Sequence, residues 1–516
     1  MEAHDRAVQK ISASVRSFYD RRVGYRIYHG STNSTRASTL SRDRMVDTSG
    51  LTSVLSVNTS TQTAIVEPNV PMDKLVAAML PHGLVPPVVM EFPGITTGGG
   101  YSGTSAESSS FRHGFFDRNI NWVEMVLANG EIVRASQENK TDLLHGAASS
   151  FGTLGVVTLL ELQLIPAKPY VEVTYHPIDN AGEIINKVEE LTNDLTNDYL
   201  DGIMFSKSIG VLISGKLVDT PKIGTKVQGF TAPTDPWFYI HAQRILSRRR
   251  GTKSAPFVDT VPLTDYLFRY DRGGFWVGAY AYKYFLTPFN RITRWVLDYF
   301  MHTRVMYHAL HKSGHSNIYV IQDVAVPYNG AVEFLEFLER DFSIYPLWLC
   351  PLKMKGKQSD SPHGLLAEVS AKASPDYLLN FGVWGPAGSK AKNAQTFIDI
   401  NRRLEQKVDR LGGKKWLYAQ TYYTEEEFWN IYNKKEYDAL RVKYHATYLP
   451  SVYDKVKTDL VAEQKRINAS WLAWLNAMFW SIWPLSGMYG VLAVVFGGDY
   501  LLPRASILQF GSKSKK

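Results

Sequence analysis

Two glycine-rich segments combine the residue types that bind phosphate groups. Residues 96–108, TTGGGYSGTSAES, interleave four glycines with hydroxyl side chains, and residues 149–157, SSFGTLGVV, run into alternating apolar positions. Glycine lets the backbone approach a ligand closely and adopt positive φ, and successive N–H groups in such loops form anion-binding concavities. The two segments together predict a cradle for a long, phosphate-bearing cofactor. For the first segment alone, a flexible Gly/Ser linker is the alternative.

The first segment also contains a formal dinucleotide fingerprint, Gly98-x-Gly100-x-x-Gly103. That motif indicates a Rossmann site only where it follows a strand and opens a helix inside a βαβ unit. Here it follows EFPGITT and precedes SAESSS, which is poor in helix-forming residues. An acidic residue does occur about 20 positions on, but this residue, Glu124, lies within the predicted strand WVEMVLA. We therefore expect a loop that is not part of a Rossmann unit.

These segments carry a family resemblance. Residues 96–120 and 151–168 resemble the flavin-binding domain of the vanillyl-alcohol-oxidase (PCMH) type. Within that superfamily the chain is similar to the Δ24-sterol reductase group over roughly residues 20–457, more weakly at about 175–310. The segments that carry this second resemblance are QDVAVP at 322–327, YPLWLCP at 345–351, LYAQTYYTEEEFW at 417–429 and EYDALRVKYHATYLPSVYDKV at 436–456.

The resemblance implies that three segments contact FAD. The glycine loop would contact the flavin ring and phosphates, and the segment that begins at His29 would form the first pyrophosphate loop. The turn from Gly152 to Gly155 would lie near the adenine and ribose, unless Gly155 simply permits a tight entry into a strand. The cofactor residues implied in this way are Thr96, Thr97, Gly98, Gly99, Gly100, Tyr101, Ser102, Gly103, Thr104, Ser105, Ala106, Glu107, Ser108, Gly30, Ser31, Thr32, Asn33, Ser34, Gly152 and Gly155.

The same comparison indicates a noncovalent flavin. Covalently flavinylated members carry a histidine shortly after the first glycine of the pyrophosphate loop, where this chain has Asn33. The single cysteine, Cys350, lies in the apolar run LWLCPL, which predicts a buried thiol and fits a reducing compartment. His29 is expected to form local hydrogen bonds. No CxxC motif or His/Cys cluster has zinc spacing, so no metal site is predicted.

The resemblance further implies reduction of the Δ24 double bond of a sterol side chain, with NADPH as electron source. An isolated alkene has no carbonyl group to absorb charge, so the protein must supply a proton donor in a pocket that excludes water, while the flavin supplies hydride. The candidate donors are Tyr418 and Tyr422, which would share a face on helix or strand spacing, and His113 and Glu107, which follow the glycine loop. The structural alternatives are core or pocket-wall tyrosines, a loop-stabilising histidine and a backbone-capping carboxylate.

Two other functions stay open at this point. The first is a flavin oxidase or dehydrogenase of the same fold that acts on an alcohol, lactone or hydroxy acid. The second is a catalytically idle FAD-binding membrane scaffold. The aromatic strip at 266–284 would line the sterol cleft under the reductase interpretation, but it is equally compatible with the core of a cap domain.

The elements that must hold these residues can be traced along the chain. Val8, Ile11, Val15 and Phe18 have helical spacing. Residues 63–70 predict a strand, residues 71–83 a helix that ends near a glycine, and Asn129-Gly130 a hairpin. Strand patterns then mix with helix patterns, which indicates an α+β fold. The expected domains are an FAD-binding domain at 1–168, a cap domain at 169–457 and a membrane-associated tail at 458–516.

Charge and hydropathy bear on the partners. The formal net charge is +8, which favours an anionic membrane surface or dinucleotide, because no basic–aromatic motif indicates nucleic acid. Residues 467–498 carry no charge, and Pro484 and Gly487 are expected to break this run into two parts. Its four tryptophans and basic flanks predict a monotopic or re-entrant hairpin, with one kinked span or a buried helical hairpin as alternatives. No signal peptide is visible at residues 1–22. We expect an endoplasmic reticulum membrane protein whose catalytic domain faces the cytosol.

Overall fold

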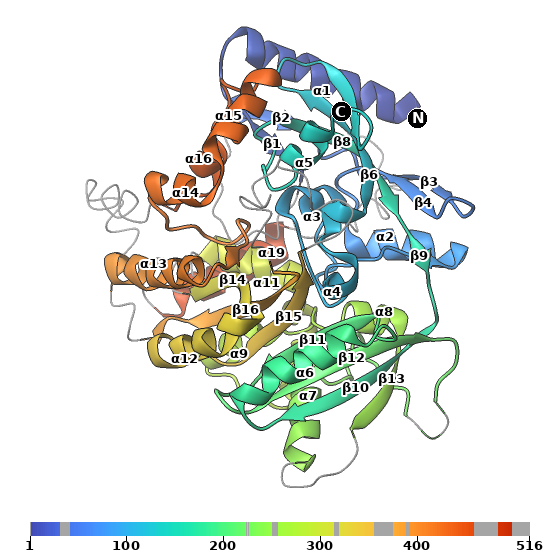
Figure 1. The fold of residues 1–516 in the computed structure, drawn as a ribbon, viewed down its shortest axis with the longest axis vertical. Helices are drawn as coiled ribbons and strands as arrows, with labels where there is room; N and C mark the ends of the chain where they lie inside the picture. Colours follow the sequence, from blue (N-terminus) through green and yellow to red (C-terminus); the bar gives the residue numbers. More distant parts are fainter. Residues whose placement is uncertain are drawn as a thin grey trace.

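The structure is a computed structural model, and it describes residues 2–30, 42–222, 224, 226–249, 256–313, 319–354, 375–388, 393–458 and 483–497. Two sheets organise this part of the chain (Figure 1). The first belongs to the N-terminal third, the second to the region that follows it.

The N-terminal sheet has five strands in the order β3-β4-β8-β6-β7, and every pair in it is antiparallel. This arrangement lacks a βαβ unit and confirms that the glycine motif is not part of a Rossmann fold. The expected hairpin at Asn129-Gly130 joins β6 to β7. The strands are β3 (Val54–Asn58), β4 (Thr63–Val66), β6 (Ile120–Leu127), β7 (Ile132–Ser136) and β8 (Gly155–Gln163).

Helices and short strands surround this sheet. The predicted first helix is confirmed as α1 (Glu2–Asp20), which buries its four expected apolar residues. The predicted helix at 71–83 is confirmed as α2 and a following 3-10 turn that ends at Gly83 in the left-handed conformation. Besides α1, the elements around this sheet are α2 (Met72–Met79), α3 (Thr97–Gly103), α4 (Ser110–His113), α5 (Thr141–Ala147), β1 (Arg26–Tyr28), β2 (Met45–Asp47), β5 (Leu84–Val85) and β9 (Ile165–Pro166).

The second sheet has eight strands in the order β13-β10-β12-β11-β15-β16-β14-β17. Along each strand, successive side chains point alternately to the two faces of the sheet. The strands are β10 (Tyr170–Ile178), β11 (Tyr199–Met204), β12 (Gly210–Val218), β13 (Phe257–Pro262), β14 (Tyr319–Pro327), β15 (Leu347–Lys353), β16 (Tyr377–Pro386) and β17 (Lys414–Lys415).

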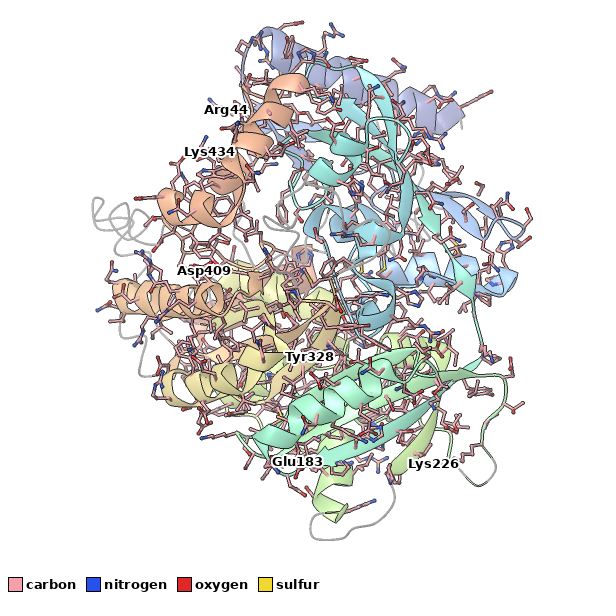
Figure 2. The ribbon with its side chains drawn as sticks, viewed as in Figure 1. Arg44, Glu183, Lys226, Tyr328, Asp409 and Lys434 are labelled. Atoms are coloured by element: carbon pink, nitrogen blue, oxygen red, sulfur yellow. The ribbon has the colours of Figure 1, made fainter. Side chains whose placement is uncertain are left out.

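One face of the second sheet is covered by α6 (Ala181–Asn193), α12 (Ala331–Asp341) and α13 (Ala394–Arg410), whose apolar stripes form one core with it. The outward sides of these helices carry exposed charges such as Glu183 and Asp409 (Figure 2). The other face meets a region rich in aromatic residues. That region contains α7 (Phe238–Arg249), α8 (Leu263–Leu267), α9 (Val277–Tyr284), α10 (Arg291–Val296) and α11 (Thr303–Ser313).

The chain then returns to the N-terminal unit. Tyr437 donates a hydrogen bond to Thr153 at 2.8 Å, and Lys443 forms an ion pair with Asp142 at 2.5 Å. The second domain predicted from sequence thus ends in a segment that packs on the first, while the domain boundaries themselves stay predictions. The returning helices are α14 (Glu425–Ile431), α15 (Lys434–Lys443) and α16 (Val452–Val456).

The C-terminal uncharged run is described only in part. Helix α19 (Leu485–Gly497) begins directly after Pro484 and contains Gly487, so the prediction that Gly487 breaks the run is wrong. A helix tolerates glycine at a modest cost, whereas proline lacks the N–H group that a helix interior needs. Among the described residues, no helix combines the length and the apolar character needed to cross a bilayer.

Candidate functional site

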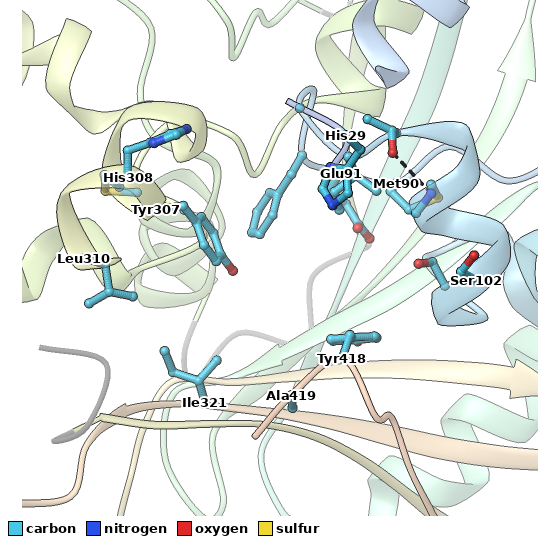
Figure 3. A pocket seen from close by; sticks show the side chains of 18 of the residues that line it. His29, Met90, Glu91, Ser102, Tyr307, His308, Leu310, Ile321, Tyr418 and Ala419 are labelled. Atoms are coloured by element: carbon cyan, nitrogen blue, oxygen red, sulfur yellow. Dashed lines mark hydrogen bonds between the residues drawn. The ribbon is translucent and has the colours of Figure 1, made fainter. Parts of the chain in front are cut away.

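A large cavity of about 950 Å³ lies where the N-terminal unit meets the aromatic side of the second sheet. This volume is at the upper end of the roughly 300–1,000 Å³ typical of ligand pockets. Figure 3 shows the cavity from close by, with His29, Glu91 and Ser102 across from Tyr418 and Ala419, and Tyr307 of α11 on a third side.

All three predicted cofactor segments reach this cavity. Nine of the implied cofactor residues line it, namely Gly30, Thr96, Gly98, Gly99, Ser102, Ser105, Ala106, Gly152 and Gly155. The others in the glycine segment do not line it, and they are Thr97, Gly100, Tyr101, Gly103, Thr104, Glu107 and Ser108, all buried. Ser31, Thr32, Asn33 and Ser34 lie outside the described residues.

Residues 97–103 of the glycine segment form the short helix α3, so the expectation of a loop is wrong there, whereas residues 104–108 are non-helical as expected. The Thr96 side chain caps α3 by accepting a hydrogen bond from the Gly99 N–H at 3.1 Å, and the helix ends at Thr104 in the left-handed conformation. A Cβ at Gly98 would lie only 2.7 Å from the Pro68 Cβ. Glycine is therefore required because α3 packs directly on the backbone next to the cavity, and this contact offsets its poor helix propensity.

The second segment is a tight turn at the start of β8. Gly155 has φ +154°, and a Cβ there would lie 2.7 Å from the Val126 carbonyl oxygen. Gly155 thus both permits the tight entry into β8 and lines the cavity. The carbonyl oxygen of the neighbouring Phe151 accepts a hydrogen bond from Lys455 Nζ at 2.7 Å.

Lys455 places a positive charge at this end of the cavity. It lines the cavity together with His29 and Gly30, and burial and the lysine charge both lower the pKa of His29. A cation beside glycine backbone fits the phosphate groups of a dinucleotide. Lys455 lies in a segment quoted for its resemblance, but nothing in its spacing singled it out as a ligand.

Replacing Lys455 with glutamine is expected to weaken FAD binding by about tenfold or more, because a charge-assisted hydrogen bond contributes roughly 1.5–3 kcal/mol. The measurement is the quenching of FAD fluorescence on titration with apoprotein. Lys457→Gln is the matched control, since Lys457 is half-exposed and pairs with Asp454 at 3.0 Å. Equal affinities for both variants would remove the phosphate-binding role of Lys455.

The opposite side of the cavity holds a buried carboxyl group, Asp323. Alternation along β14 directs Val320 and Val324 to the helix-covered core and leaves Ile321 and Asp323 at the cavity. The Asp323 Oδ2 accepts a hydrogen bond from Trp384 Nε1 at 3.3 Å, whereas Oδ1 is buried and has no hydrogen-bond partner in the part of the chain that the structure describes. Sequence reasoning missed Asp323, although QDVAVP places one acid among apolar residues.

Burial raises the pKa of Asp323 to about 7, although interactions with Trp384, Tyr418 and Asn380 lower it. The group therefore carries a proton for much of its time at neutral pH. Burial and the nearby Asp323 carboxyl raise the pKa of Tyr418 well above its usual value, so that Tyr418 keeps its proton. The pair resembles the tuned acids that enzymes use for proton transfer.

A second buried carboxyl group, Glu91, also lines the cavity (Figure 3). Burial and the nearby Glu107 carboxyl raise its pKa well above the usual range. Its Oε1 is buried without a hydrogen-bond partner among the described residues. The cavity thus contains two acidic groups held toward their neutral forms.

Of the four predicted catalytic residues, only Tyr418 lines the cavity. Tyr418 lies in a turn, while Tyr422 belongs to the core beneath the helices and donates a hydrogen bond to Gln420. The expectation that the two tyrosines share a face is wrong, because the segment between them is neither helix nor strand. The catalytic role of Tyr422 has no geometric support.

Glu107 and His113 take structural roles. The Glu107 carboxylate accepts hydrogen bonds from the Ser109 N–H at 2.9 Å and from the Ser108 hydroxyl at 2.7 Å, so it caps the backbone that leads into α4. Burial and the charges of Arg112 and Lys353 lower the pKa of His113 to about 4, which leaves it neutral and without the imidazolium proton that a general acid would donate. Neither residue lines the cavity.

The remaining walls of the cavity are largely apolar. The aromatic strip at 266–284 divides between the two structural roles expected for it. Tyr266 and Tyr270 are buried in the core, while Phe275, Val277 and Tyr284 line the cavity. Trp348 and Trp384 of the second sheet add flat apolar surface beside Asp323. This end can hold an apolar ligand, whereas the glycine-rich end can hold phosphate groups.

Fold and site together define a flavin-dependent oxidoreductase. Residues 6–136 match the family model described as "FAD binding domain", and the glycine cradle with Lys455 fits that cofactor. Over 448 residues the chain is 30% identical to the Delta(24)-sterol reductase of Arabidopsis thaliana, which covers 81% of this chain and 78% of the relative. The Homo sapiens Delta(24)-sterol reductase is 29% identical over 414 residues, 79% of this chain and 76% of the relative.

A more distant relative shares only part of the chain. Cytokinin dehydrogenase 4 of Oryza sativa subsp. japonica is 30% identical over 136 residues, 26% of this chain and 25% of its own length. The chain belongs to the Delta(24)-sterol reductase family.

Proposed function

We propose that this protein reduces the Δ24 double bond of a sterol side chain with noncovalently bound FAD that NADPH reduces. The observation that carries the proposal is Asp323, a proton-bearing carboxyl group in a cavity with apolar walls. The names of the relatives support the substrate class. NADPH is the electron source implied by the resemblance of the sequence.

Bound FAD would supply the hydride, and the remaining requirements fall on residues of the chain. The Asp323 carboxyl group gives its proton to the less substituted alkene carbon, so that positive charge develops on the tertiary carbon that receives hydride. Tyr418 positions the carboxyl group and keeps its own proton. Trp348 and Trp384 exclude water, which would otherwise capture the cation. The overall reaction consumes one NADPH and one proton for each double bond.

We also propose that the protein acts at the endoplasmic reticulum membrane, with its catalytic domain facing the cytosol. A membrane-dissolved sterol and the uncharged run at 467–498 support this placement. Fractionation of cells that express a tagged chain tests it, and protease treatment of sealed microsomes should digest the catalytic domain. Protection of that domain would place it in the lumen instead.

The reaction is tested anaerobically. Purified protein in detergent is reduced with NADPH, a Δ24-unsaturated sterol is added, and flavin reoxidation is followed together with loss of the alkene. Reoxidation with a saturated product supports the proposal. If the sterol leaves the flavin reduced while oxygen or a hydroxy compound turns it over, the chain is an oxidase or dehydrogenase of the same fold.

The flavin is expected to leave the protein on acid precipitation, because the only cysteine, Cys350, is buried at 0% exposure and no covalent link is predicted. The measurement is flavin absorbance in the supernatant, with the absence of a fluorescent protein band on a denaturing gel as its complement. Flavin that stays with the precipitated protein would contradict the noncovalent assignment.

A further inference from the structure

Exposed large apolar side chains gather on two segments of the described chain. Twelve of the fifteen such side chains lie within residues 286–299 and 483–496, and the other three, Leu195, Val227 and Val442, are scattered. Single exposed apolar residues are ordinary on a protein surface. A concentration of this kind marks a site of interaction.

The second segment packs on the residues that flank the first segment on both sides. Trp483 Nε1 donates a hydrogen bond to the Tyr284 carbonyl oxygen at 2.8 Å, and Gly487 of α19 packs on the rings of Tyr284 and Phe285. Helix α19 also packs along α11, which follows the first segment (Figure 1). The most exposed side chains are Leu286 at 76%, Ile292 at 71% and Val296 at 62% in the first segment, and Phe496 at 83% in the second.

This surface continues into the cavity. Tyr284 and Phe285 at the end of α9, Phe300 beyond α10 and Val491 of α19 all line the cavity. The elements that expose apolar side chains outward therefore also form the wall of the apolar end of the site.

The charges of the two segments indicate the partner. The first segment contains Arg291 and Arg294 and one acidic residue, Asp298, which is buried and paired with Arg272 at 2.7 Å; Lys283 lies just before this segment, and α19 carries no charge. Lys283 and Arg291 are exposed. Cations beside exposed tryptophan and tyrosine suit the interface of an anionic bilayer, where aromatic rings lie at headgroup depth and basic residues are attracted by surface charge.

We propose that residues 286–299 and 483–496 form one membrane-docking surface, which lies in the headgroup region of an anionic leaflet and opens the apolar end of the cavity to membrane lipid. The internal segment is a second point of attachment beside the uncharged C-terminal run. The proposal deepens the proposed function and rests on it only for the identity of the lipid that enters.

The test uses the full chain with Trp295→Cys labelled by an environment-sensitive dye. Trp295 is 56% exposed, and Cys350 is buried, so that the introduced thiol is the one that reacts. With vesicles of phosphatidylcholine and phosphatidylserine we expect a blue shift of the dye emission, reduced with phosphatidylcholine alone. Leu195→Cys, 82% exposed and far along the chain from both segments, is the matched control and should show no shift.

Two outcomes would overturn the proposal. If the protein sediments with vesicles but the dye at residue 295 shows no blue shift, the C-terminal run alone attaches the protein to the membrane. A shift that needs no vesicles and grows with protein concentration would identify the surface as a contact between two copies of the chain.

Sterol turnover, measured in detergent and in vesicles, distinguishes a failure of the docking surface from a failure of the proposed function. Ile292→Glu with Val296→Glu should keep its sterol turnover in detergent and lose at least tenfold in turnover of sterol supplied in vesicles. Neither residue lines the cavity. Equal turnover of vesicle-bound sterol by the variant and the parent would contradict the docking surface. Absence of sterol turnover by the parent in detergent would instead contradict the proposed function and leave the dye measurement valid.

Discussion

Replacing Asp323 with asparagine is expected to slow the reoxidation of reduced flavin by a Δ24-unsaturated sterol by about 10²–10⁴-fold, the usual contribution of a positioned acid. Asparagine keeps the size of the side chain and an oxygen that can accept the Trp384 hydrogen bond, but it has no acidic proton. The measurement is single-turnover absorbance of the flavin after anaerobic reduction. Reduction of the flavin by NADPH should stay within about twofold, because it requires no proton from Asp323.

The role of Asp323 as an acid also fixes the direction in which the rate of the sterol half-reaction changes with pH. Activity needs the protonated carboxyl group, and the pKa of Asp323 is raised to about 7. The sterol half-reaction should therefore be fastest below pH 7 and fall as the pH rises through that value, and the variant should lose this dependence. A parent rate that rises with pH through 7 would exclude Asp323 as the acid.

The unfolding temperature of Asp323→Asn distinguishes a loss of catalysis from a loss of folded protein. A carboxyl group whose pKa is raised on folding destabilises the native state increasingly as the pH rises above its unfolded value, since the native protein then binds the extra proton. Asparagine cannot ionise. Asp323→Asn should therefore unfold at the same or a higher temperature than the parent at pH 8, with Asn380→Asp as a contrasting variant that adds an acid beside it.

The elements near the N-terminus could be predicted because their signals are local. The spacing of Val8, Ile11, Val15 and Phe18 specifies one helical stripe, and Asn129-Gly130 between apolar runs specifies a hairpin. Helix α3 escaped prediction because its glycines are unfavourable in an isolated helix. They are accommodated by close packing on Pro68 and Met90, which no local pattern contains.

The site escaped sequence reasoning for a similar reason. Asp323 and Lys455 become site residues only because β14 and α16 bring distant parts of the chain to the glycine segments. The tyrosine segment was correctly associated with the cavity at Tyr418, but a turn there separates it from Tyr422. The apolar segment 286–299 has no distinctive signal in the sequence, because Arg291 and Arg294 interrupt its apolar residues. Its exposure is a property of the tertiary structure.

The second large effect is expected at a buried ion pair behind the aromatic wall. Asp201 is fully buried and accepts hydrogen bonds from Arg269 at 2.8 Å, from the Tyr270 hydroxyl at 2.7 Å and from Trp348 Nε1 at 3.1 Å. Tyr270 in turn stacks on Phe275 with ring centroids 3.9 Å apart. Since Trp348 and Phe275 line the cavity, this carboxylate anchors the wall against which an apolar ligand would lie.

Replacing Arg269 with methionine is expected to lower the free energy of unfolding by about 3–5 kcal/mol, the usual cost of leaving a buried charge without its partner. The measurement is a urea titration followed by tryptophan fluorescence. Arg340→Met is the matched control, because the Arg340 side chain is 71% exposed and its pairing with Asp341 should contribute little. A loss at Arg269 no larger than the loss at Arg340 would contradict the prediction.

A double variant identifies the cause. Combining Arg269→Met with Asp201→Asn removes both charges and leaves an amide oxygen for Tyr270 and Trp348 to bond. The double variant should therefore be more stable than Arg269→Met alone, because the penalty arises from the unpaired carboxylate rather than from the loss of arginine packing. If the double variant is the less stable of the two, the arginine contributes through its contacts with the Tyr266 and Tyr270 rings instead.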